Sequence, residues 1–365
     1  MTPLFPPSHY SDPDVELREQ AAIFRRLWQF VGFRHELAHD NDYVCRTIGG
    51  RSVFVQNFDG ELRAFENVCS HRFNRIHDDG CGNRRTQCRY HGWIYNSDGL
   101  PSAIPHRPRF DDLDAEKTCA LRLTSWQAEC CGGLVFVRQT SDGPSLREYL
   151  GDCFDSVAQM TSALGPQIDR NEMLIAANWK VLVENTLESY HVDFVHTDSF
   201  KKLGTVCGEA NWQWQLPHSC YTSPLAEKYD AGARKFLKVF DERPVTLPGY
   251  LHQLVFPNLT IASTYGTSYS IQHFEPLGAE QTRFTSYVFQ TQLANEPQGA
   301  KATIVETINH SVRDFNRQVF EEDRAVCEGV HKGAKQTRGG GILSDEELRV
   351  SQFQRSYVEA LGAAE

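Results

Sequence analysis

The sequence has no apolar run long enough to span a membrane. Its longest apolar stretch, residues 130–137, includes two glycines and is far shorter than the roughly 20 residues a transmembrane helix needs. The first ten residues contain neither the basic segment nor the apolar segment of a secretory signal peptide. We therefore expect a cytoplasmic protein with no membrane partner.

Positive charge is also scarce. The chain has 37 Lys and Arg against 47 Asp and Glu, a net charge of −10, which argues against a nucleic-acid-binding face. We find no internal repeat and no low-complexity tract. The eleven cysteines are odd in number and accompany no export signal, so we interpret them as reduced thiols and metal ligands rather than disulfides.

The remaining composition is that of a globular protein. Hydrophobic residues make up 40% of the 365 positions and charged residues 23%, and this length suits about two domains. Gly49-Gly50 and Asp59-Gly60 predict tight hairpin turns between short strands, so residues 40–140 resemble a small antiparallel β domain. A linker is expected at 162–169. Beyond it, the patterns predict a helix from 178, strands at 253–263, 269–274 and 282–292, and helices at 299–332 and 345–361.

Two short Cys/His pairs form the first chemical signal. Cys69-Ser-His71 is followed sixteen residues later by Cys88-Arg-Tyr-His91. Tetrahedral zinc accepts two cysteines and two histidines, but the usual zinc motif has two cysteines in one pair and two histidines in the other. One Cys and one His on each loop suit a cluster whose two irons are held by two cysteines and two histidines respectively. The run from Cys88 to Trp93 resembles the second loop of the Rieske [2Fe–2S] family, with structural zinc as the alternative.

A second group of candidate ligands follows in residues 178–196. Glu188 and His191 are three residues apart and share a helical face. His191 and His196 are five apart, about 140° on a regular helix, so both can face one metal only if the helix ends, kinks or bulges between them. Two histidines and one carboxylate are the ligand set of non-heme Fe(II) oxygenases.

The expected late helix offers the carboxylate. Measured from Val312 at 100° per residue, Asp323 lies about 20° from the centre of an apolar stripe, Glu322 about 80° away and Glu321 opposite. A buried carboxylate must be paired or metal-bound. Asp323 is therefore the candidate ligand, and the alternative is a salt bridge to a buried arginine.

Taken together, the two groups resemble the catalytic (alpha) subunits of Rieske non-heme iron oxygenases. This resemblance implies an α+β fold, with an N-terminal helix packing on the catalytic domain (1–38), a small antiparallel β Rieske domain (39–150) and a helix-grip catalytic domain (151–365). It also implies one [2Fe–2S] cluster on Cys69, His71, Cys88 and His91, and one mononuclear Fe(II) on His191, His196 and Asp323.

The resemblance further implies a homotrimer in which Glu188 bridges His191 of its own chain and the partner subunit's His91. Electrons would come from an NAD(P)H-dependent flavin or iron–sulfur reductase, directly or through a ferredoxin. Many ring-dihydroxylating members have Asp at the bridging position. This chain has Glu, as do members that act on choline and carnitine. Tyr190 either tunes the site or packs beside it.

The substrate is the least determined feature. We expect a terminal oxygenase that hydroxylates or oxidatively dealkylates a small organic molecule, with an aromatic substrate favoured and a quaternary amine as the alternative. An electron-transfer Rieske protein is the second alternative. Asn185, Val192, Phe194 and Phe256 are the candidate pocket residues. A loop-rich aromatic group is expected at Trp212, Trp214 and Tyr221, which form either a cage for a cation or ordinary packing.

Overall fold

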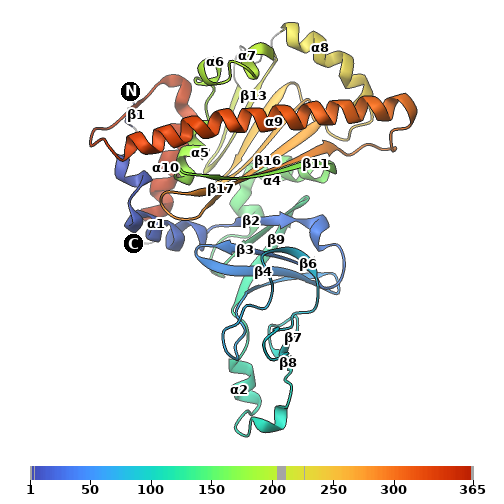
Figure 1. Cartoon of the computed structure of the whole chain (residues 1–365), viewed down its shortest axis with the longest axis vertical. Coiled ribbons are helices and arrows are strands. Elements are labelled where there is room, and N and C mark those ends of the chain that lie inside the picture. Colours follow the sequence, from blue (N-terminus) through green and yellow to red (C-terminus); the bar gives the residue numbers. More distant parts are fainter. Residues whose placement is uncertain (1, 4, 204–210, 226, 363–365) are drawn as a thin grey trace. The chain divides into compact units, whose positions relative to one another are not determined.

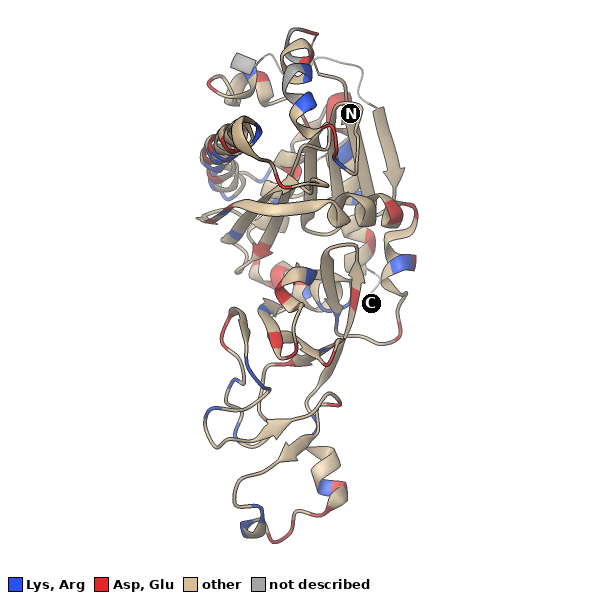
Figure 2. Ribbon diagram, turned by 90° about the vertical axis from the view of Figure 1, so that its right-hand side faces the viewer, with Lys and Arg blue, Asp and Glu red and all other residues tan. Residues whose placement is uncertain are grey.

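The computed structural model describes residues 2–3, 5–203, 211–225 and 227–362. The chain divides into two compact units, one of residues 19–154 and one of residues 1–18 and 155–365. Antiparallel sheets with helices build both units, as the α+β prediction requires (Figure 1). Acidic and basic residues are spread over the chain rather than gathered by sign (Figure 2).

Seven antiparallel strands form the main sheet of the N-terminal unit, in the order β2-β10-β9-β5-β4-β3-β6. Both expected hairpin turns are confirmed, since Gly49 and Gly50 have φ values of 55° and 72°, and Asp59 and Gly60 of 52° and 94°. The strands are β2 (Gln29–Phe33), β3 (Asp42–Ile48), β4 (Arg51–Phe58), β5 (Glu61–Glu66), β6 (Gly80–Asn83), β9 (Ser125–Cys131) and β10 (Leu134–Arg138).

Short elements complete this unit. The hairpin of β7 (Ile94–Tyr95) and β8 (Pro101–Ala103) comes directly after the second Cys/His loop, and α2 (Ala115–Ala120) and α3 (Leu146–Leu150) follow it along the chain. A buried cluster on the loop side of the sheet includes Cys69, Cys88 and Trp93. The loops are therefore anchored in the apolar core rather than resting on the surface.

The first expected domain boundary differs from the observed one. Residues 19–38 were predicted with the N-terminal helix, but they belong to the unit of residues 19–154. The physical reason is β2, which pairs antiparallel with β10 and is buried along its whole length. The helix α1 (Pro13–Glu19) is accordingly shorter than the expected segment.

The second unit is a seven-stranded antiparallel sheet in the order β11-β17-β16-β15-β14-β13-β12, crossed by the 36-residue helix α9 (Figure 1). Its strands are β11 (Leu164–Ile175), β12 (Asn211–Gln215), β13 (His218–Ser223), β14 (Tyr250–Val255), β15 (Leu259–Thr264), β16 (Ser268–Pro276) and β17 (Thr282–Thr291). Its helices are α4 (Phe154–Ser162), α5 (Trp179–Thr186), α6 (Val192–Val195), α7 (Phe200–Leu203), α8 (Glu227–Leu237), α9 (Gly299–Ala334) and α10 (Leu348–Gly362), and β1 (Thr2–Pro3) pairs with β18 (Ile342–Leu343).

Three local expectations about this unit are wrong. The segment 162–169, expected as a linker, lies mostly in β11, which pairs with β17. The run 253–263 spans two strands, because β14 turns into β15 after Val255. Trp212, Trp214 and Tyr221, expected in a loop-rich region, lie on the paired strands β12 and β13. Polar residues interrupt each of these runs, so short-range patterns do not reveal the strand pairing.

Candidate metal centres

The two Cys/His loops repeat one backbone turn. In the first, Phe73 N donates to Cys69 O at 2.9 Å, and in the second, Gly92 N donates to Cys88 O at 2.9 Å. The donor residue has a positive φ in both loops, 62° at Phe73 and 73° at Gly92. Equivalent turns therefore present one cysteine and one histidine each.

Both thiols are buried where polar groups reach them. Cys69 and Cys88 are each 1% exposed. The Tyr95 hydroxyl lies 3.0 Å from Cys69 Sγ, and Asn74 Nδ2 lies 3.8 Å from Cys88 Sγ. Burial raises the pKa of the Cys69 thiol, so a positive centre is needed to hold it as a thiolate.

The two imidazoles stand together. The ring centroids of His71 and His91 are 4.7 Å apart, and His71 stacks on Trp93 at 4.7 Å. Burial, and then the neighbouring His91, lower the pKa of His71, so its ring is neutral. Its buried Nδ1 has no hydrogen-bond partner in the described part of the chain. A neutral ring with a free nitrogen fits a metal ligand, so the two cysteines and two histidines fit the iron–sulfur cluster.

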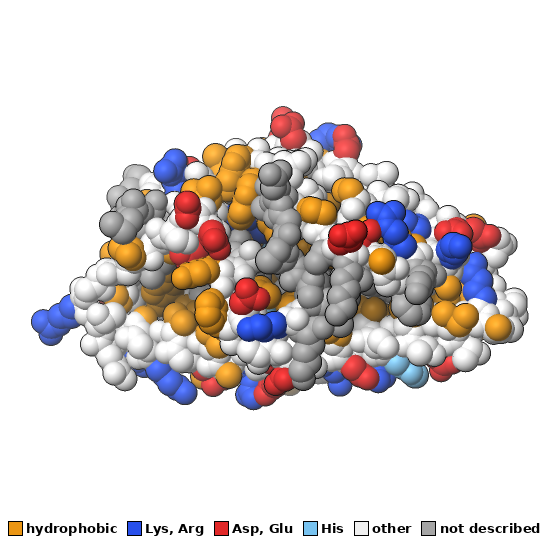
Figure 3. All heavy atoms as spheres, turned by 90° about the horizontal axis from the view of Figure 1, so that it is seen from above, with side chains coloured by type: hydrophobic (Ala, Val, Ile, Leu, Met, Phe, Trp, Pro, Cys, Tyr) orange, Lys and Arg blue, Asp and Glu red, His pale blue; other side chains and the backbone are white. Residues whose placement is uncertain are grey.

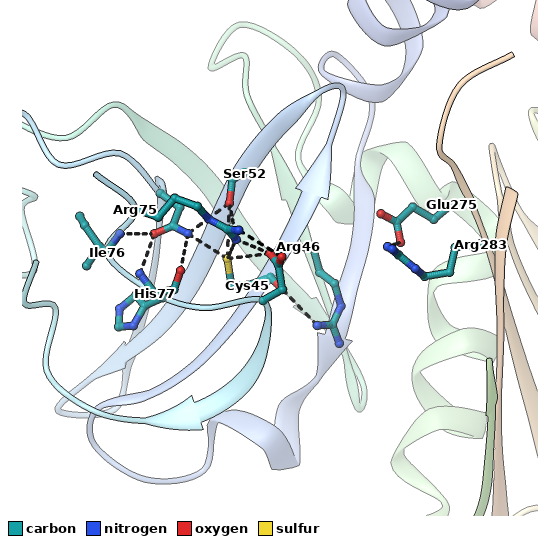
Figure 4. A network of polar contacts seen from close by, with 10 residues as sticks. Cys45, Arg46, Ser52, Arg75, Ile76, His77, Glu275 and Arg283 are labelled. Atoms are coloured by element: carbon teal, nitrogen blue, oxygen red, sulfur yellow. Dashed lines mark hydrogen bonds and ion pairs between the residues drawn. The ribbon is translucent and has the colours of Figure 1, made fainter. Parts of the chain in front are cut away.

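A polar network fixes the first loop to the sheet (Figure 4). Asn67 Oδ1 accepts the N–H groups of Ile76 and His77 at 2.9 and 2.8 Å, and Asn67 Nδ2 donates to Ser52 Oγ at 3.1 Å. Arg75 Nη2 also donates to Ser52 Oγ, at 3.2 Å. The loop that carries Cys69 and His71 is therefore bonded to β4, an arrangement that no motif in the sequence indicates.

The helix that carries the second group ends before its histidines. Asn178 caps α5 by accepting the N–H of Lys180 at 3.1 Å, and α5 finishes at Thr186. The one-turn helix α6 then begins directly after His191 and ends directly before His196. This break confirms the expectation from their spacing, and the two Nε2 atoms lie 3.3 Å apart.

Asp323 on α9 completes the group. Its Oδ1 lies 3.2 Å from His196 Nε2 and 3.6 Å from His191 Nε2. The three candidate ligand atoms all lie within 4.8 Å of one another. Asn185 Nδ2 donates to the same Oδ1 at 2.9 Å, and no arginine is paired with Asp323 among the described residues.

Two further carboxylates hold the imidazoles from behind. Glu188 Oε1 contacts His191 Nδ1, and Glu322 Oε2 lies 2.7 Å from His196 Nδ1. When each Nδ1–H donates to its carboxylate, each Nε2 keeps a lone pair directed toward Asp323. Three electron-pair donors then converge on one point, which fits a divalent cation such as iron.

The pKa of His196 follows from this arrangement. Burial alone lowers the pKa of His196, but Asp323 and then Glu322 outweigh it and raise the pKa above its usual value. The orienting role of Glu322 was missed at the sequence level. Glu322 lies about 80° from the centre of the apolar stripe on α9, so the helical pattern did not indicate it. Only the tertiary structure shows that His196 packs against that side of α9.

A cavity of about 730 Å³ opens beside these residues. Asn185 and Val192 line it, as do Trp212 and Tyr221, whose ring centroids are 5.2 Å apart. Trp214 is 42% exposed and stacks on the outer side of Trp212 at 6.0 Å without lining the cavity. Apolar and polar side chains of α9 and the sheet together make up more than half of the lining.

Three predicted residues lie elsewhere. Phe256 is not a lining residue, because it falls in the turn after β14 and packs on Phe353 of α10 at 5.8 Å. Phe194 is 75% exposed and does not line the cavity. Tyr190 is 56% exposed, faces Phe194 at 6.3 Å and is not a lining residue of the cavity.

Comparison with known proteins agrees with this geometry. The family described as "Ring hydroxylating alpha subunit (catalytic domain)" matches residues 157–363, and the "Rieske [2Fe-2S] domain" matches residues 27–124. The chain belongs to the ring-hydroxylating oxygenase alpha subunits, and it is a Rieske non-heme iron oxygenase. It accordingly carries a Rieske cluster and a mononuclear iron, which the two candidate centres fit.

Individual relatives have low sequence identity to this chain but align with it over nearly its whole length. The carnitine monooxygenase oxygenase subunit of Acinetobacter pittii is 26% identical over 372 residues, which cover 98% of this chain and 94% of that protein. The large oxygenase component of naphthalene 1,2-dioxygenase from Pseudomonas aeruginosa is 25% identical, covering 92% and 82%. A quaternary ammonium Rieske monooxygenase solved with L-carnitine has a TM-score of 0.78 at 22% identity, covering 100% and 95%, and shares the fold.

Proposed function

We propose that this chain is the terminal oxygenase component of a Rieske system that hydroxylates or oxidatively dealkylates a small organic substrate. Cys69, His71, Cys88 and His91 would hold the cluster, and His191, His196 and Asp323 the mononuclear iron. Bound iron supplies oxygen activation and the cluster supplies electrons. The main support for this proposal is that His191 Nε2, His196 Nε2 and Asp323 Oδ1 converge on one point. Glu188 and Glu322 hold the two imidazoles in that arrangement.

Glu188 has a double role in this proposal. Its carboxylate already contacts His191 Nδ1 and also accepts the His191 N–H at 3.2 Å, so it fixes the ring and its tautomer. A carboxylate retains further acceptor sites, which can take a hydrogen bond from the partner subunit's His91. Glu188 then links the two centres across the interface of a homotrimer.

Exposed aromatic side chains support such an interface. Beside the cluster loops, Phe73 is 79% exposed and Tyr90 52%. Beside the iron ligands, Tyr190 and Phe194 are 56% and 75% exposed. The face that includes α6 and α7 carries apolar side chains among charged ones (Figure 3). Each metal site thus has its own exposed aromatic pair, which association of subunits would bury.

An aromatic substrate suits the cavity. Val192, Leu237, Phe240, Val312 and Phe315 are among its apolar lining residues. Asn185 and Asn316 add polar groups beside them. A planar hydrocarbon ring would gain hydrophobic contact on these walls and remain close to the iron ligands.

A quaternary amine is the second candidate. Trp212, Tyr221 and Tyr250 line the cavity as a chain of rings with centroid distances of 5.2 and 6.3 Å. Such faces attract a trimethylammonium group. Carnitine is the substrate named for the relative from Acinetobacter pittii.

The electron donor in this proposal is an NAD(P)H-dependent flavin or iron–sulfur reductase, with or without a ferredoxin. Among the described residues, no helix is both long enough and apolar enough to cross a membrane. The cytoplasmic location stays a prediction.

The test is a reconstituted assay. The purified protein should contain about three irons and two acid-labile sulfides per chain, and with a reductase it should show substrate-stimulated NADH and O2 consumption. His196→Ala should lose turnover while its cluster keeps the visible absorption. A colourless zinc protein would contradict the proposal, and turnover retained in His196→Ala would contradict the ligand assignment.

A further inference from the structure

A buried arginine faces the cavity without an acidic partner. Arg349, at the start of α10, is 2% exposed and lines the cavity. Its Nε donates to Ser219 Oγ at 3.1 Å and its Nη1 to His252 Nδ1 at 3.1 Å. Its Nη2 lies 3.3 and 3.4 Å from the carbonyl oxygens of the same two residues. All of these partners are neutral, and no described carboxylate pairs with the guanidinium.

His252 adds a second donor at the same place. It lies on β14 opposite Tyr221 of β13 and Ala262 of β15, and all three side chains line the cavity. Because Nδ1 accepts from Arg349, the ring hydrogen is on Nε2. This buried Nε2 has no hydrogen-bond partner in the part of the chain that the structure describes. Burial, and then Arg349, hold the pKa of His252 well below its usual value, so the ring stays a neutral donor.

The carboxylates that line the cavity do not pair with Arg349. Burial lowers the pKa of Arg349 to about 10, so it remains charged at neutral pH. Glu188 and Asp323 are the carboxylates among the lining residues. Both carboxylates belong to the iron site, where they contact His191 and His196, and Glu322 contacts His196 from behind. The guanidinium therefore lies in the lining without a contact to any described carboxylate.

An uncompensated buried charge is costly, and a buried donor without a partner adds to the cost. A cationic ligand would meet repulsion at this end of the cavity, whereas an anionic ligand would receive charge-assisted hydrogen bonds. Tyr250, another lining residue, is influenced by both charged groups. Burial raises its pKa, Arg349 opposes this, and Tyr221 and then Asp323 add to it, so Arg349 and Asp323 both influence this hydroxyl.

We propose that Arg349 and His252 form a carboxylate subsite, and that the substrate is an aromatic acid anchored there with its reactive carbon turned toward the iron ligands. This inference rests on the proposed function only in taking the cavity as the substrate site. The competing explanation is that Arg349 merely ties α10 to β13 and β14.

Binding of matched probes separates these explanations. Phenylacetate, phenylacetamide and benzyltrimethylammonium would be titrated into the holoenzyme without reductase, following heat by calorimetry and the fluorescence of tryptophan, since Trp212 lines the cavity. We expect phenylacetate to bind at least about tenfold more tightly than the amide, as charge-assisted hydrogen bonds predict. The preference should persist in iron-free protein, because the acid is not held by the metal.

Variants then assign the preference to the two residues. Arg349→Met should bring the acid-to-amide ratio close to one, and His252→Phe should reduce it. The matched control Ser219→Ala removes one bond of the arginine and keeps both donors, so it should retain the preference. If Arg349→Met does not fold, His252→Phe and the wild-type comparison decide.

The outcomes are distinct. Equal affinity for acid and amide in the wild type, or tighter binding of the cation, would overturn the subsite. A Ser219→Ala variant that loses the preference as fully as Arg349→Met would favour the tying role. Acid preference in a protein without oxygenase turnover would instead contradict only the proposed function.

Discussion

Glu322 provides the sharpest test of how the iron ligands are held. Its Oε2 accepts from His196 Nδ1 at 2.7 Å, and Ser199 Oγ and Gln318 Nε2 bond the same carboxylate at 2.5 and 3.1 Å. Glu322→Gln keeps the shape of the side chain and removes its charge. The amide can present its N–H to the ring, which favours the tautomer with the hydrogen on Nε2, the wrong one for a ligand.

The expected loss is in iron affinity. Removing the carboxylate behind a metal-bound histidine costs 10–100-fold in affinity, or about 1.4 to 2.7 kcal/mol. The His196 side chain is only 2% exposed and the Glu322 side chain 19%, so water screens this contact poorly. We therefore expect a value in the upper part of that range.

Anaerobic competition with a coloured ferrous chelator would measure the dissociation constant. Glu321→Gln is the matched control, because the neighbouring Glu321 pairs with Arg324 and its side chain is 58% exposed. Cluster absorption should stay unchanged in both variants. An iron affinity in Glu322→Gln equal to that of the wild type, or an equal loss in Glu321→Gln, would refute the orienting role.

Three further predictions concern the electron link, pH and the core. Glu188→Gln should leave both metals bound while coupled product formation falls steeply, and near wild-type turnover would exclude the bridging role. Burial raises the pKa of Glu184 from 4.5 to about 7, so its contribution to stability is complete below pH 4.5 and is lost as the pH rises to about 7. Between pH 4 and pH 8, the free energy of unfolding of Glu184→Gln should rise relative to that of the wild type by on the order of 3 kcal/mol. Denaturant titrations across this pH range measure the difference, and a difference that does not change with pH would refute the pKa shift. Phe353→Ala should lower the free energy of unfolding by about 3–5 kcal/mol in a denaturant titration, because the 1% exposed ring packs on Trp179 and Phe256. A loss below about 1 kcal/mol would show that neighbouring side chains fill the space left by the ring.

Local chemistry made much of the site predictable. Paired Cys/His loops, two histidines five residues apart and an acid in an apolar helical stripe are each visible within a short window of sequence. Such features depend on the chain's own geometry, which is why the break at α6 and the choice of Asp323 over Glu321 agree with the structure. The turns at Gly49-Gly50 and Asp59-Gly60 belong to the same class, since positive φ is a property of the residues themselves.

Only the tertiary structure decided which distant residues meet. Helical periodicity gives a side chain's angle about its own axis, but not what packs against that angle, so Glu322 was set aside although His196 lies beside it. Phe256 had the right composition for a pocket and is covered by Phe353, which lies 97 positions later. Arg349 gave no signal in its own helix. Its importance comes from two strands more than 90 residues earlier, because the cost of a buried charge depends on which groups the whole fold brings to it.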